Sequence, residues 1–271
     1  MSKLKMWDAH VSWDQAEIAW DEGAKNAASK CPIKTLAILP NMPGMTEETK
    51  KHLKWKAFKW MIRKDHKFSL LKKFFKHPFT YGYRLIKSLL SAKSLRIDRD
   101  FYFYGINSEE EFTQYLKRKD TLLVLGFSYC HKPFECPSGR FSDLCIAEKD
   151  HPVCRQCFIG KCVSALPKTG VIPLFIPTIH YIGGKILDIV HANPEKKVIF
   201  LITACEMTLK MFADLGIMAG IKGIGVRLDG RICNTLKAFE LSEEGIKPGL
   251  TVVTAEYQKK MLNLLRIRRE A

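Results

Sequence analysis

Five runs of consecutive apolar residues mark the second half of the chain. Helical patterns separate the middle runs, at about 184–192 and 205–215. Continuous apolar strands that alternate with helices indicate parallel βαβ units, so we expect an α/β fold with a small, three-layer, mostly parallel sheet. The expected strands are TLLVLGFS at 121–128, GVIPLFIP at 170–177, KVIFLITA at 197–204, IKGIGVRL at 221–228 and a weaker GLTVV at 249–253.

The first half of the chain has the periodicity of helices. Ser12 and Ser108 each precede a Gln or Glu by three residues, which is the spacing of a capping box. These spacings predict a helix over 12–29 and a short helix after residue 108. The run TLAILP at 35–40 has the length of a short strand.

Lysines and apolar residues are interleaved from 50 to 96 in the pattern of basic amphipathic helices. This stretch holds fifteen Lys and Arg and a single acid, Asp65. Pro78 and Gly82 are expected to interrupt its helices. The tail at 259–271 is expected to form one more basic amphipathic helix.

The formal net charge of +16 is concentrated at the two ends of the chain. Residues 1–119 carry 24 Lys and Arg against 13 Asp and Glu, residues 120–258 carry 15 against 14, and residues 259–271 carry 5 against 1. Cysteine has the opposite distribution, since eight of the nine lie within 120–258. We therefore divide the chain into a basic, mainly helical N-terminal region, a cysteine-rich α/β domain and a basic C-terminal helix, with these boundaries.

The basic stretch 50–96 indicates a partner with negative charge. Lysines supply charge and aromatic side chains supply apolar contact, which suits an acidic protein, an anionic membrane surface or nucleic-acid phosphates. Lysine outnumbers arginine here, which disfavours base-specific recognition of nucleic acid. A solvated outer face on ordinary helices accounts for the charge equally well.

The chain has no apolar run near the roughly 20 residues of a membrane-spanning helix. Acids occupy the N-terminal stretch where a signal peptide would be apolar. We therefore expect a cytoplasmic protein, with peripheral attachment to a membrane as a variant. In a reducing compartment, cysteines serve metal binding or redox chemistry rather than structural disulfides.

Six of the cysteines fall within the 33 residues from 130 to 162, together with three prolines and no periodic apolar pattern. A segment this long without regular structure needs cross-links to offset the entropy lost on ordering it. Cys154 and Cys157 have the spacing with which two thiolates chelate one ion through a turn. The thiols of this expected metal-binding loop are Cys130, Cys136, Cys145, Cys154, Cys157 and Cys162.

Two further cysteines, Cys205 and Cys233, follow the third and fourth expected strands, as Cys130 follows the first. The carboxyl ends of parallel strands meet at one edge of the sheet, so we expect these thiols to converge there, with the loop as a lid. Thr203 and Glu206 have capping-box spacing, which predicts Cys205 in the first turn of a helix whose free amides favour thiolate.

Eight thiols suffice for two four-cysteine clusters, or for one cluster and a second metal or redox pair. A zinc knuckle lacks its second cysteine pair, although His131 and His151 offer a mixed site. Scattered thiols at a sheet edge suit a redox centre better, so we expect one or two iron–sulfur clusters, of the [4Fe-4S] type, with zinc as the alternative. The expected ligands are Cys154, Cys157, Cys162 and Cys205, then Cys130, Cys136, Cys145 and Cys233.

The stretch from 130 to about 253 resembles the prokaryotic family catalogued as the domain of unknown function number 116. The resemblance is carried by CHKPFECPSG, CRQCFIGKC, ITACEMTL around Cys205 and VRLDGRICNT around Cys233. Ile232 stands where the family usually has glycine before that cysteine. The resemblance implies a cysteine-rich domain that binds metal or an iron–sulfur cluster, and it supplies no catalytic residues.

Three functions remain as hypotheses. The first is an iron–sulfur protein that transfers electrons, with a redox protein as partner, or performs catalysis at the cluster. The second is a zinc-stabilised interaction module that docks on an acidic partner or a membrane through its basic helices. The third is a thiol oxidoreductase that uses Cys154 and Cys157, which the lack of a thioredoxin-like strand before this pair disfavours.

Overall fold

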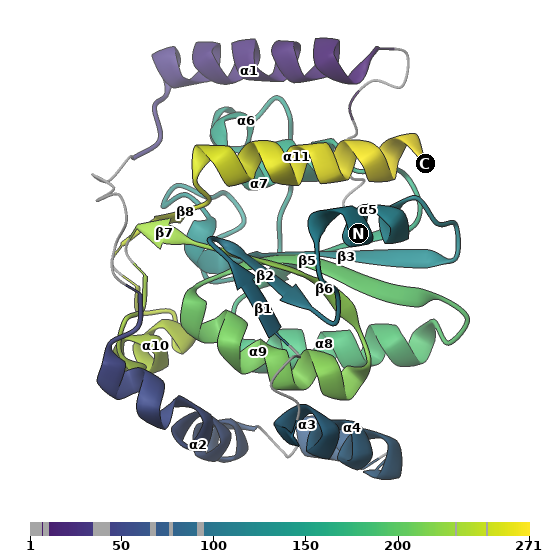
Figure 1. Ribbon diagram of the computed structural model, residues 1–271. Helices are drawn as coiled ribbons and strands as arrows, with labels where there is room; N and C mark the ends of the chain where they lie inside the picture. Colours follow the sequence, from purple (N-terminus) through teal and green to yellow (C-terminus); the bar gives the residue numbers. More distant parts are fainter. Residues whose placement is uncertain are drawn as a thin grey trace.

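A six-stranded sheet lies at the centre of the computed structural model (Figure 1). The strand order is β1-β2-β6-β5-β3-β4, in which β4, β3, β5 and β6 are parallel while β2 and β1 continue the sheet antiparallel. The strands are β1 (Leu95–Asp98), β2 (Phe101–Tyr104), β3 (Thr121–Ser128), β4 (Val171–Ile176), β5 (Lys197–Ala204) and β6 (Lys222–Arg227).

The structure describes residues 7, 11–34, 44–65, 69–75, 78–90, 95–230, 232–247 and 249–271. The expected strand at 35–40 lies outside these residues. Four of the five apolar runs form the parallel strands, which confirms the α/β prediction. The fifth run contributes only β8 (Thr251–Val252), which pairs with β7 (Asp229–Gly230) in a separate two-stranded sheet.

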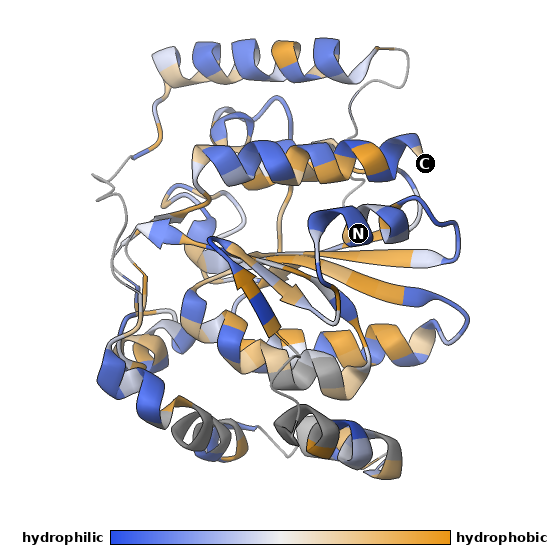
Figure 2. Cartoon of the chain, viewed as in Figure 1, coloured by the Kyte–Doolittle hydropathy of each residue, from blue (hydrophilic) through white to orange (hydrophobic). Residues whose placement is uncertain are grey.

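Helices cover both faces of the central sheet. One apolar core unites one face with α5, α7 and α11, and a second core unites the other face with α8 and α9. Figure 2 shows apolar residues along the strands and in the helices beneath them. The bounds are α5 (Glu109–Leu116), α7 (Phe158–Ser164), α8 (Ile179–Ala192), α9 (Glu206–Ala219) and α11 (Ala255–Glu270).

The path of the chain places a switch point between β3 and β5. From β3 the chain passes through α6 (Pro152–Gln156) and α7 on one face to reach β4. It then returns through α8 on the other face to reach β5, on the opposite side of β3. The two connections thus run on opposite faces of the sheet. Such a change of face opens a crevice at the carboxyl ends of the strands, where α/β sheets bind ligands.

The basic helices form an outer layer against α8 and α9. They are α2 (Glu47–Lys64), α3 (Ser69–Phe74) and α4 (Pro78–Leu90), and α4 contacts α9 while α3 contacts α8. Pro78 begins α4, as expected for a residue that cannot continue a helix. Gly82 lies inside α4 and does not interrupt it, because one glycine costs a helix only about 1 kcal/mol.

The hairpin of β1 and β2 adds two strands to an N-terminal region whose other described elements are helices. All four side chains of β2, FYFY, are buried, and the strand pairs with β6. The turn of the hairpin includes Arg99, whose φ of 51° lies in the left-handed region. The sheet therefore extends into the segment that the charge distribution assigned to the N-terminal region.

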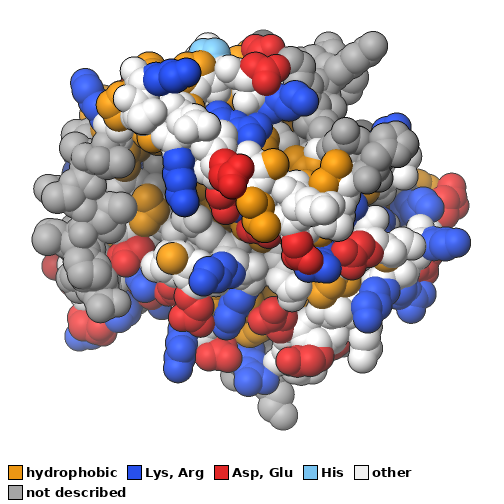
Figure 3. All heavy atoms as spheres, turned by 90° about the horizontal axis from the view of Figure 1, so that it is seen from above, with side chains coloured by type: hydrophobic (Ala, Val, Ile, Leu, Met, Phe, Trp, Pro, Cys, Tyr) orange, Lys and Arg blue, Asp and Glu red, His pale blue; other side chains and the backbone are white. Residues whose placement is uncertain are grey.

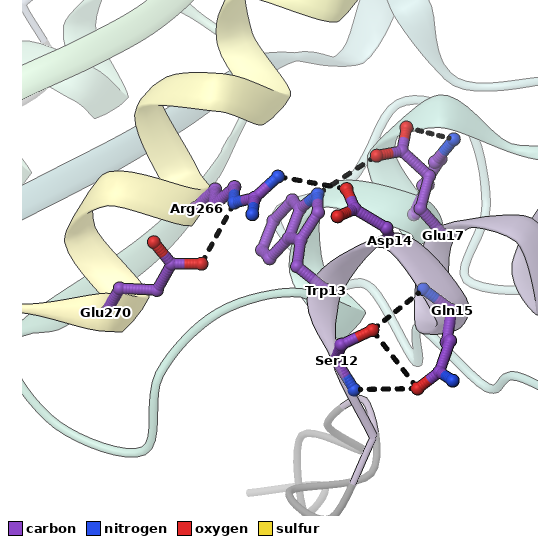
Figure 4. A network of polar contacts seen from close by, with 8 residues as sticks. Ser12, Trp13, Asp14, Gln15, Glu17, Arg266 and Glu270 are labelled. Carbon is purple, nitrogen blue, oxygen red and sulfur yellow. Dashed lines mark hydrogen bonds and ion pairs between the residues drawn. The ribbon is translucent and has the colours of Figure 1, made fainter.

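Helix α1 (Trp13–Lys30) closes over the cysteine-rich segment. Ser12 and Gln15 form the capping box that the sequence predicts, and Asp14 binds Arg266 of α11 at 2.9 Å (Figure 4). On α6, the Arg155 guanidinium lies 4.5 Å from the centre of the Trp20 ring. Helix α1, near the start of the chain, thus contacts both α11, at its end, and α6, in the cysteine-rich segment.

The surface over α1 carries both signs of charge. Figure 3 shows Lys and Arg side chains interspersed with Asp and Glu on this face. The tail at 259–271 belongs to α11, whose Met261 and Leu265 are fully buried. The basic tail is therefore a packed element of the fold. Within the described residues, no helix is both long and apolar enough to span a membrane.

Candidate functional site

A cavity of about 30 Å³ lies at the carboxyl ends of β3, β4 and β5, at the switch point of the sheet. We call it the strand-end cavity. Cys130, Cys205 and Cys233 line it together with Glu243 and Lys247. The structure thus brings together the three cysteines that follow expected strands.

Cys205 and Cys233 line the same small cavity, and each thiol shifts the pKa of the other. The Lys247 ammonium donates to Cys233 Sγ at 3.4 Å, and Cys205 Sγ lies 3.2 Å from Thr208 Oγ1. Cys130 lines the same cavity, and burial raises the pKa of its thiol. The strand-end cavity therefore contains one pair of thiols, and the Lys247 ammonium lies beside one of them, Cys233.

The two members of the pair differ in acidity. The hydrogen bond from Cys205 and the charge of Lys247 lower the pKa of Cys233 to about 5, against the opposing effect of burial. The same hydrogen bond and burial raise the pKa of Cys205 well above its ordinary value. Burial raises the pKa of Glu243 to about 8. At neutral pH the cavity therefore presents a thiolate, a thiol and a largely protonated carboxyl.

The capping box expected around Cys205 does not form. Strand β5 continues through Ala204, so Thr203 is a buried strand residue whose hydroxyl has no hydrogen-bond partner. Glu206 is the first residue of α9, and its carboxylate accepts from the Met45 amide at 3.0 Å. Cys205 consequently stands just before the helix, where its carbonyl accepts from the Leu209 amide at 3.0 Å.

A second set of thiols surrounds a cavity of about 10 Å³ within the cysteine-rich segment, which we call the loop cavity. Four cysteines line it: Cys136, Cys145, Cys154 and Cys157. The first two lie in a stretch without helix or strand at 132–151, which follows the short 3-10 helix η2 (Tyr129–His131). The other two lie within and directly after α6. One chain segment therefore delivers four sulfurs to one place.

Backbone amides point at three of these four sulfurs. Such bonds favour thiolate, the form that binds metals, and in iron–sulfur proteins they tune the cluster. Burial has the larger effect here, and it raises the pKa of Cys145 to about 11 and that of Cys157 to about 12. The donors are the amides of Ala147 to Cys145, of Glu148 to Cys154, and of Ile159 and Gly160 to Cys157.

Gly160 permits the close approach of α7 to α6. A Cβ at this position would lie 2.3 Å from the carbonyl oxygen of Cys154. Since carbonyl backbone cannot yield as a flexible side chain does, any larger residue would push the two helices apart. The start of α7, which offers its amides to Cys157, therefore depends on glycine.

Lys132 places a buried positive charge beside the loop cavity. Its side chain is 1% exposed, and its ammonium donates to the carbonyls of Ser142 and Leu144 at 2.8 Å, to that of Gly139 at 3.3 Å, and to the Ser142 hydroxyl at 3.0 Å. All four acceptors are neutral. A buried cation needs anionic neighbours, and the surrounding cysteines become anions when they bind a metal.

The remaining candidate ligands lie elsewhere. Cys162 is fully buried in the core formed by α7 and lines neither cavity. His151 caps α6 by accepting from the Val153 amide at 3.2 Å through Nδ1. His131 is buried with Nδ1 unpartnered, and burial lowers its pKa to about 4. The eight thiols therefore divide into four around the loop cavity, three around the strand-end cavity and one in the core.

Within the part of the chain that the structure describes, no three Cys, His, Asp or Glu side chains are arranged to hold a metal ion as they stand. All nine cysteines are described, and each is free of disulfide bonds. To hold one metal, the loop-cavity thiols would have to rotate about their side-chain bonds, which moves each sulfur between staggered positions. Their donor set, four thiols with amides directed at three of them, fits both zinc and an iron–sulfur cluster.

A hollow of about 560 Å³ lies along the same carboxyl edge, over β2 and β6. Two ion pairs involve its lining: Arg227 binds Asp100 at 2.7 Å, and Glu206 binds Lys210 at 2.8 Å. The hollow adjoins the strand-end cavity because Glu206 follows Cys205 in the chain.

Several residues of both cavities escape prediction from the sequence. Lys132, Glu243 and Lys247 occur in stretches without any motif, and only folding brings them to the thiols. Gly160 carries no distinctive signal in the sequence, since Gly82 also lies inside a helix but a Cβ there would meet no atom within 4 Å.

Comparisons of the chain with protein-family models, with curated proteins and with solved structures find no match. The resemblance to domain of unknown function number 116 therefore stays a prediction that depends on the segments quoted above.

Proposed function

We propose that the protein is an iron–sulfur protein with a redox role, and that Cys136, Cys145, Cys154 and Cys157 hold the cluster. The observation that carries this proposal is the gathering of four thiols around one cavity. A cluster bound there would supply one-electron transfer, or catalysis if one iron lacks a protein ligand. The proposed ligand set keeps four of the eight thiols expected from the sequence.

Three features of the chain support an anionic cluster at this place. Four thiolates and sulfide carry several negative charges, which the buried ammonium of Lys132 offsets. The amides directed at the sulfurs stabilise thiolate. The packing of α1 on α6 shields the site, through contacts such as that of Arg155 with the Ala19 carbonyl at 2.7 Å. Burial of this kind holds water away and sets the reduction potential.

The test is metal analysis of the whole protein purified without oxygen. We expect iron and acid-labile sulfide in a fixed ratio to the chain, with a visible absorption band that reduction bleaches. Cys31→Ser serves as the control for loss of one thiol, because Cys31 is exposed and lines neither cavity, and its contact with α6 is made by its backbone carbonyl, which accepts from Gln156 at 2.8 Å. A colourless protein that carries one zinc per chain would overturn the iron–sulfur proposal.

Zinc is the second candidate, because the loop cavity of about 10 Å³ has the size of a single ion. Four cysteines complete a tetrahedral structural zinc site. In this function the metal stabilises the loop, and the basic helices bind a partner. The choice between the two metals is settled by the same analysis.

The partner that suits the basic helices best is an anionic membrane surface. Phe79, Tyr83 and Ile86 lie on one face of α4 and are 91%, 68% and 60% exposed. An exposed apolar face within a stretch of fifteen Lys and Arg matches a helix that lies in the plane of a membrane. We expect sedimentation with phosphatidylserine vesicles that salt weakens and that Phe79→Ser reduces. Ile246→Ser is the matched control, since Ile246 is 56% exposed on another surface; equal binding to neutral vesicles would contradict this candidate.

A further inference from the structure

The strand-end cavity contains reactive groups that a metal centre in the loop does not use. We propose that Cys205 and Cys233 form a second redox site, in which a small peroxide oxidises the pair to a disulfide. The inference rests on contacts within this cavity, and it is independent of which metal the loop binds.

The position of the two sulfurs supports bond formation between them. Cys205 stands between β5 and α9, and Cys233 lies on the segment that leads from β7 to α10 (Leu236–Glu243). Although these segments are separate, both thiols line the same cavity of about 30 Å³, and each shifts the pKa of the other. A disulfide between them requires side-chain rotation that brings the two sulfurs within bonding distance.

The size of the cavity selects the oxidant. A volume of about 30 Å³ accommodates two water-sized groups, which matches the two oxygens of hydrogen peroxide. A peptide disulfide is too large to enter it. Thr208, Glu243 and Lys247 supply a hydroxyl, a carboxyl and an ammonium that can hydrogen-bond a peroxide.

The reaction balances within the cavity. The Cys233 thiolate attacks one peroxide oxygen, so that an S–O bond forms, the O–O bond breaks, and the departing hydroxide takes a proton from the Glu243 carboxyl to leave as water. The Cys205 thiol then attacks the sulfenic sulfur of Cys233, so that the S–S bond forms, the S–O bond breaks, and the hydroxyl leaves with the thiol proton as a second water. Two thiols lose two electrons, and one peroxide becomes two waters. A dithiol reverses the oxidation by thiol–disulfide exchange.

The surroundings of Cys233 favour attack at neutral pH. Titratable groups reach it from every side of the cavity: Tyr129 and Cys130 after β3, Cys205 before α9, Glu243 at the end of α10, and Lys247 beyond it. Only Lys247 contributes a positive charge among these, and its 3.4 Å contact favours the thiolate. We therefore expect the oxidation rate to be nearly constant from pH 6 to 7 and to fall as the pH decreases through about 5.

The experiment treats the whole, reduced protein with hydrogen peroxide, blocks the remaining thiols by alkylation and maps disulfides by mass spectrometry. The Cys205–Cys233 disulfide is expected to appear first and to disappear with dithiothreitol. In Cys205→Ser, the sulfenic acid of Cys233 persists and is captured by dimedone, whereas Cys31→Ser behaves as the unmodified chain does. A first oxidation at any other cysteine, or a Cys233 that stays free while others oxidise, overturns the proposal.

The metal content of the same samples separates this inference from the proposed function. A disulfide that forms in protein without iron supports the thiol pair and contradicts the iron–sulfur proposal alone. An intact cluster beside an unreactive Cys233 contradicts the thiol pair alone. The pH profile of the unmodified chain adds a test that needs no variant, since a rate that rises tenfold per pH unit from 6 to 7 would show an ordinary thiol and overturn the proposal.

Discussion

The loop cavity and the strand-end cavity both bury cysteines, yet they prepare these cysteines for different chemistry. In the strand-end cavity, a neighbouring thiol and the Lys247 ammonium lower the pKa of Cys233 to about 5. In the loop cavity, burial holds the pKa of Cys157 at about 12, although two amides point at its sulfur. Among the strand-end thiols, contacts favour the thiolate of Cys233, whereas burial favours the protonated form of Cys145, Cys154 and Cys157. Burial raises the pKa of a thiol, and at Cys233 the contacts outweigh this effect.

Arg140 joins the two sites mechanically. Its guanidinium donates to the carbonyl of Lys247 at 2.8 Å and to that of Cys130 at 3.2 Å, and also to the carbonyl of Gly249. It donates as well to the carbonyl of Lys132, beside the loop cavity, at 3.3 Å. The segment that presents Lys247 to Cys233 is thus tied to the segment that carries the loop thiols.

The largest effect is expected from a substitution that removes one proposed metal ligand of the loop cavity. Cys157→Ser removes one of four ligands and replaces a thiolate by a hydroxyl that stays protonated, so the chain should lose its metal almost completely. Metal and sulfide per chain measure the effect. Cys162→Ala, which changes a core cysteine outside both cavities, should keep its metal. Equal retention of metal by both variants would refute the ligand assignment.

A second change tests the loop cavity without touching a sulfur. Gly160→Ala places a methyl group 2.3 Å from the Cys154 carbonyl, which should cost roughly 1–3 kcal/mol of stability and separate α6 from α7. The metal should then dissociate faster into a competing chelator. Gly82→Ala in α4 is a control for glycine replacement outside the helix contact, since a Cβ there would meet no atom within 4 Å. Faster release from Gly82→Ala than from Gly160→Ala would contradict this role.

A third change tests the effect of the Lys247 charge on Cys233. Lys247→Met removes the cation at Cys233 and should raise the pKa of that thiol, so oxidation of Cys233 by hydrogen peroxide at pH 6 should slow by about tenfold. Mass spectrometry of the Cys233 peptide follows the rate. Lys237→Met, on the exposed side of α10, should leave it unchanged. Alkylation of Cys157 should not respond to either variant.

A fourth change concerns the dependence of stability on pH. The folded-state pKa of Glu243 is about 8, above its value in the unfolded chain of roughly 4.3. The stability that its protonated form allows is therefore complete below about pH 4 and is lost as the pH rises through 8, by on the order of 4 kcal/mol. Glu243→Gln should abolish this decline in urea unfolding, whereas Glu244→Gln, at an exposed position, should retain it. Parallel stability curves for Glu243→Gln and the unmodified chain would disprove the shift.

The sequence predicts the sheet better than it predicts the sites. Continuous apolar runs such as KVIFLITA reveal buried parallel strands, because both faces of each strand must be apolar. The four aromatic residues of β2 are too short a run to predict a strand from the sequence. They form a strand because they pair with β6. For the sites, strand ends correctly place Cys130, Cys205 and Cys233 at one edge.

Spacing alone does not show which loop thiols face one another. Cys162 follows Cys157 by five residues, which made it a candidate ligand, but α7 turns its side chain into the core. Cys136 and Cys145 are nine residues apart in irregular chain, and they meet because Lys132 gathers the carbonyls of Gly139, Ser142 and Leu144 around its ammonium. Contacts of this kind depend on tertiary structure that no local pattern records.

The most direct test of the difference between the two cavities is residue-resolved alkylation of the native protein, before and after removal of metal by a chelator. We expect Cys136, Cys145, Cys154 and Cys157 to be protected from alkylation before treatment and to become reactive together after it. Cys233 should be oxidised by hydrogen peroxide at neutral pH in both states. Protection of Cys205 and Cys233 by metal, or reactivity of the four loop cysteines that the chelator does not change, would contradict the division of the thiols into a metal centre and a redox pair.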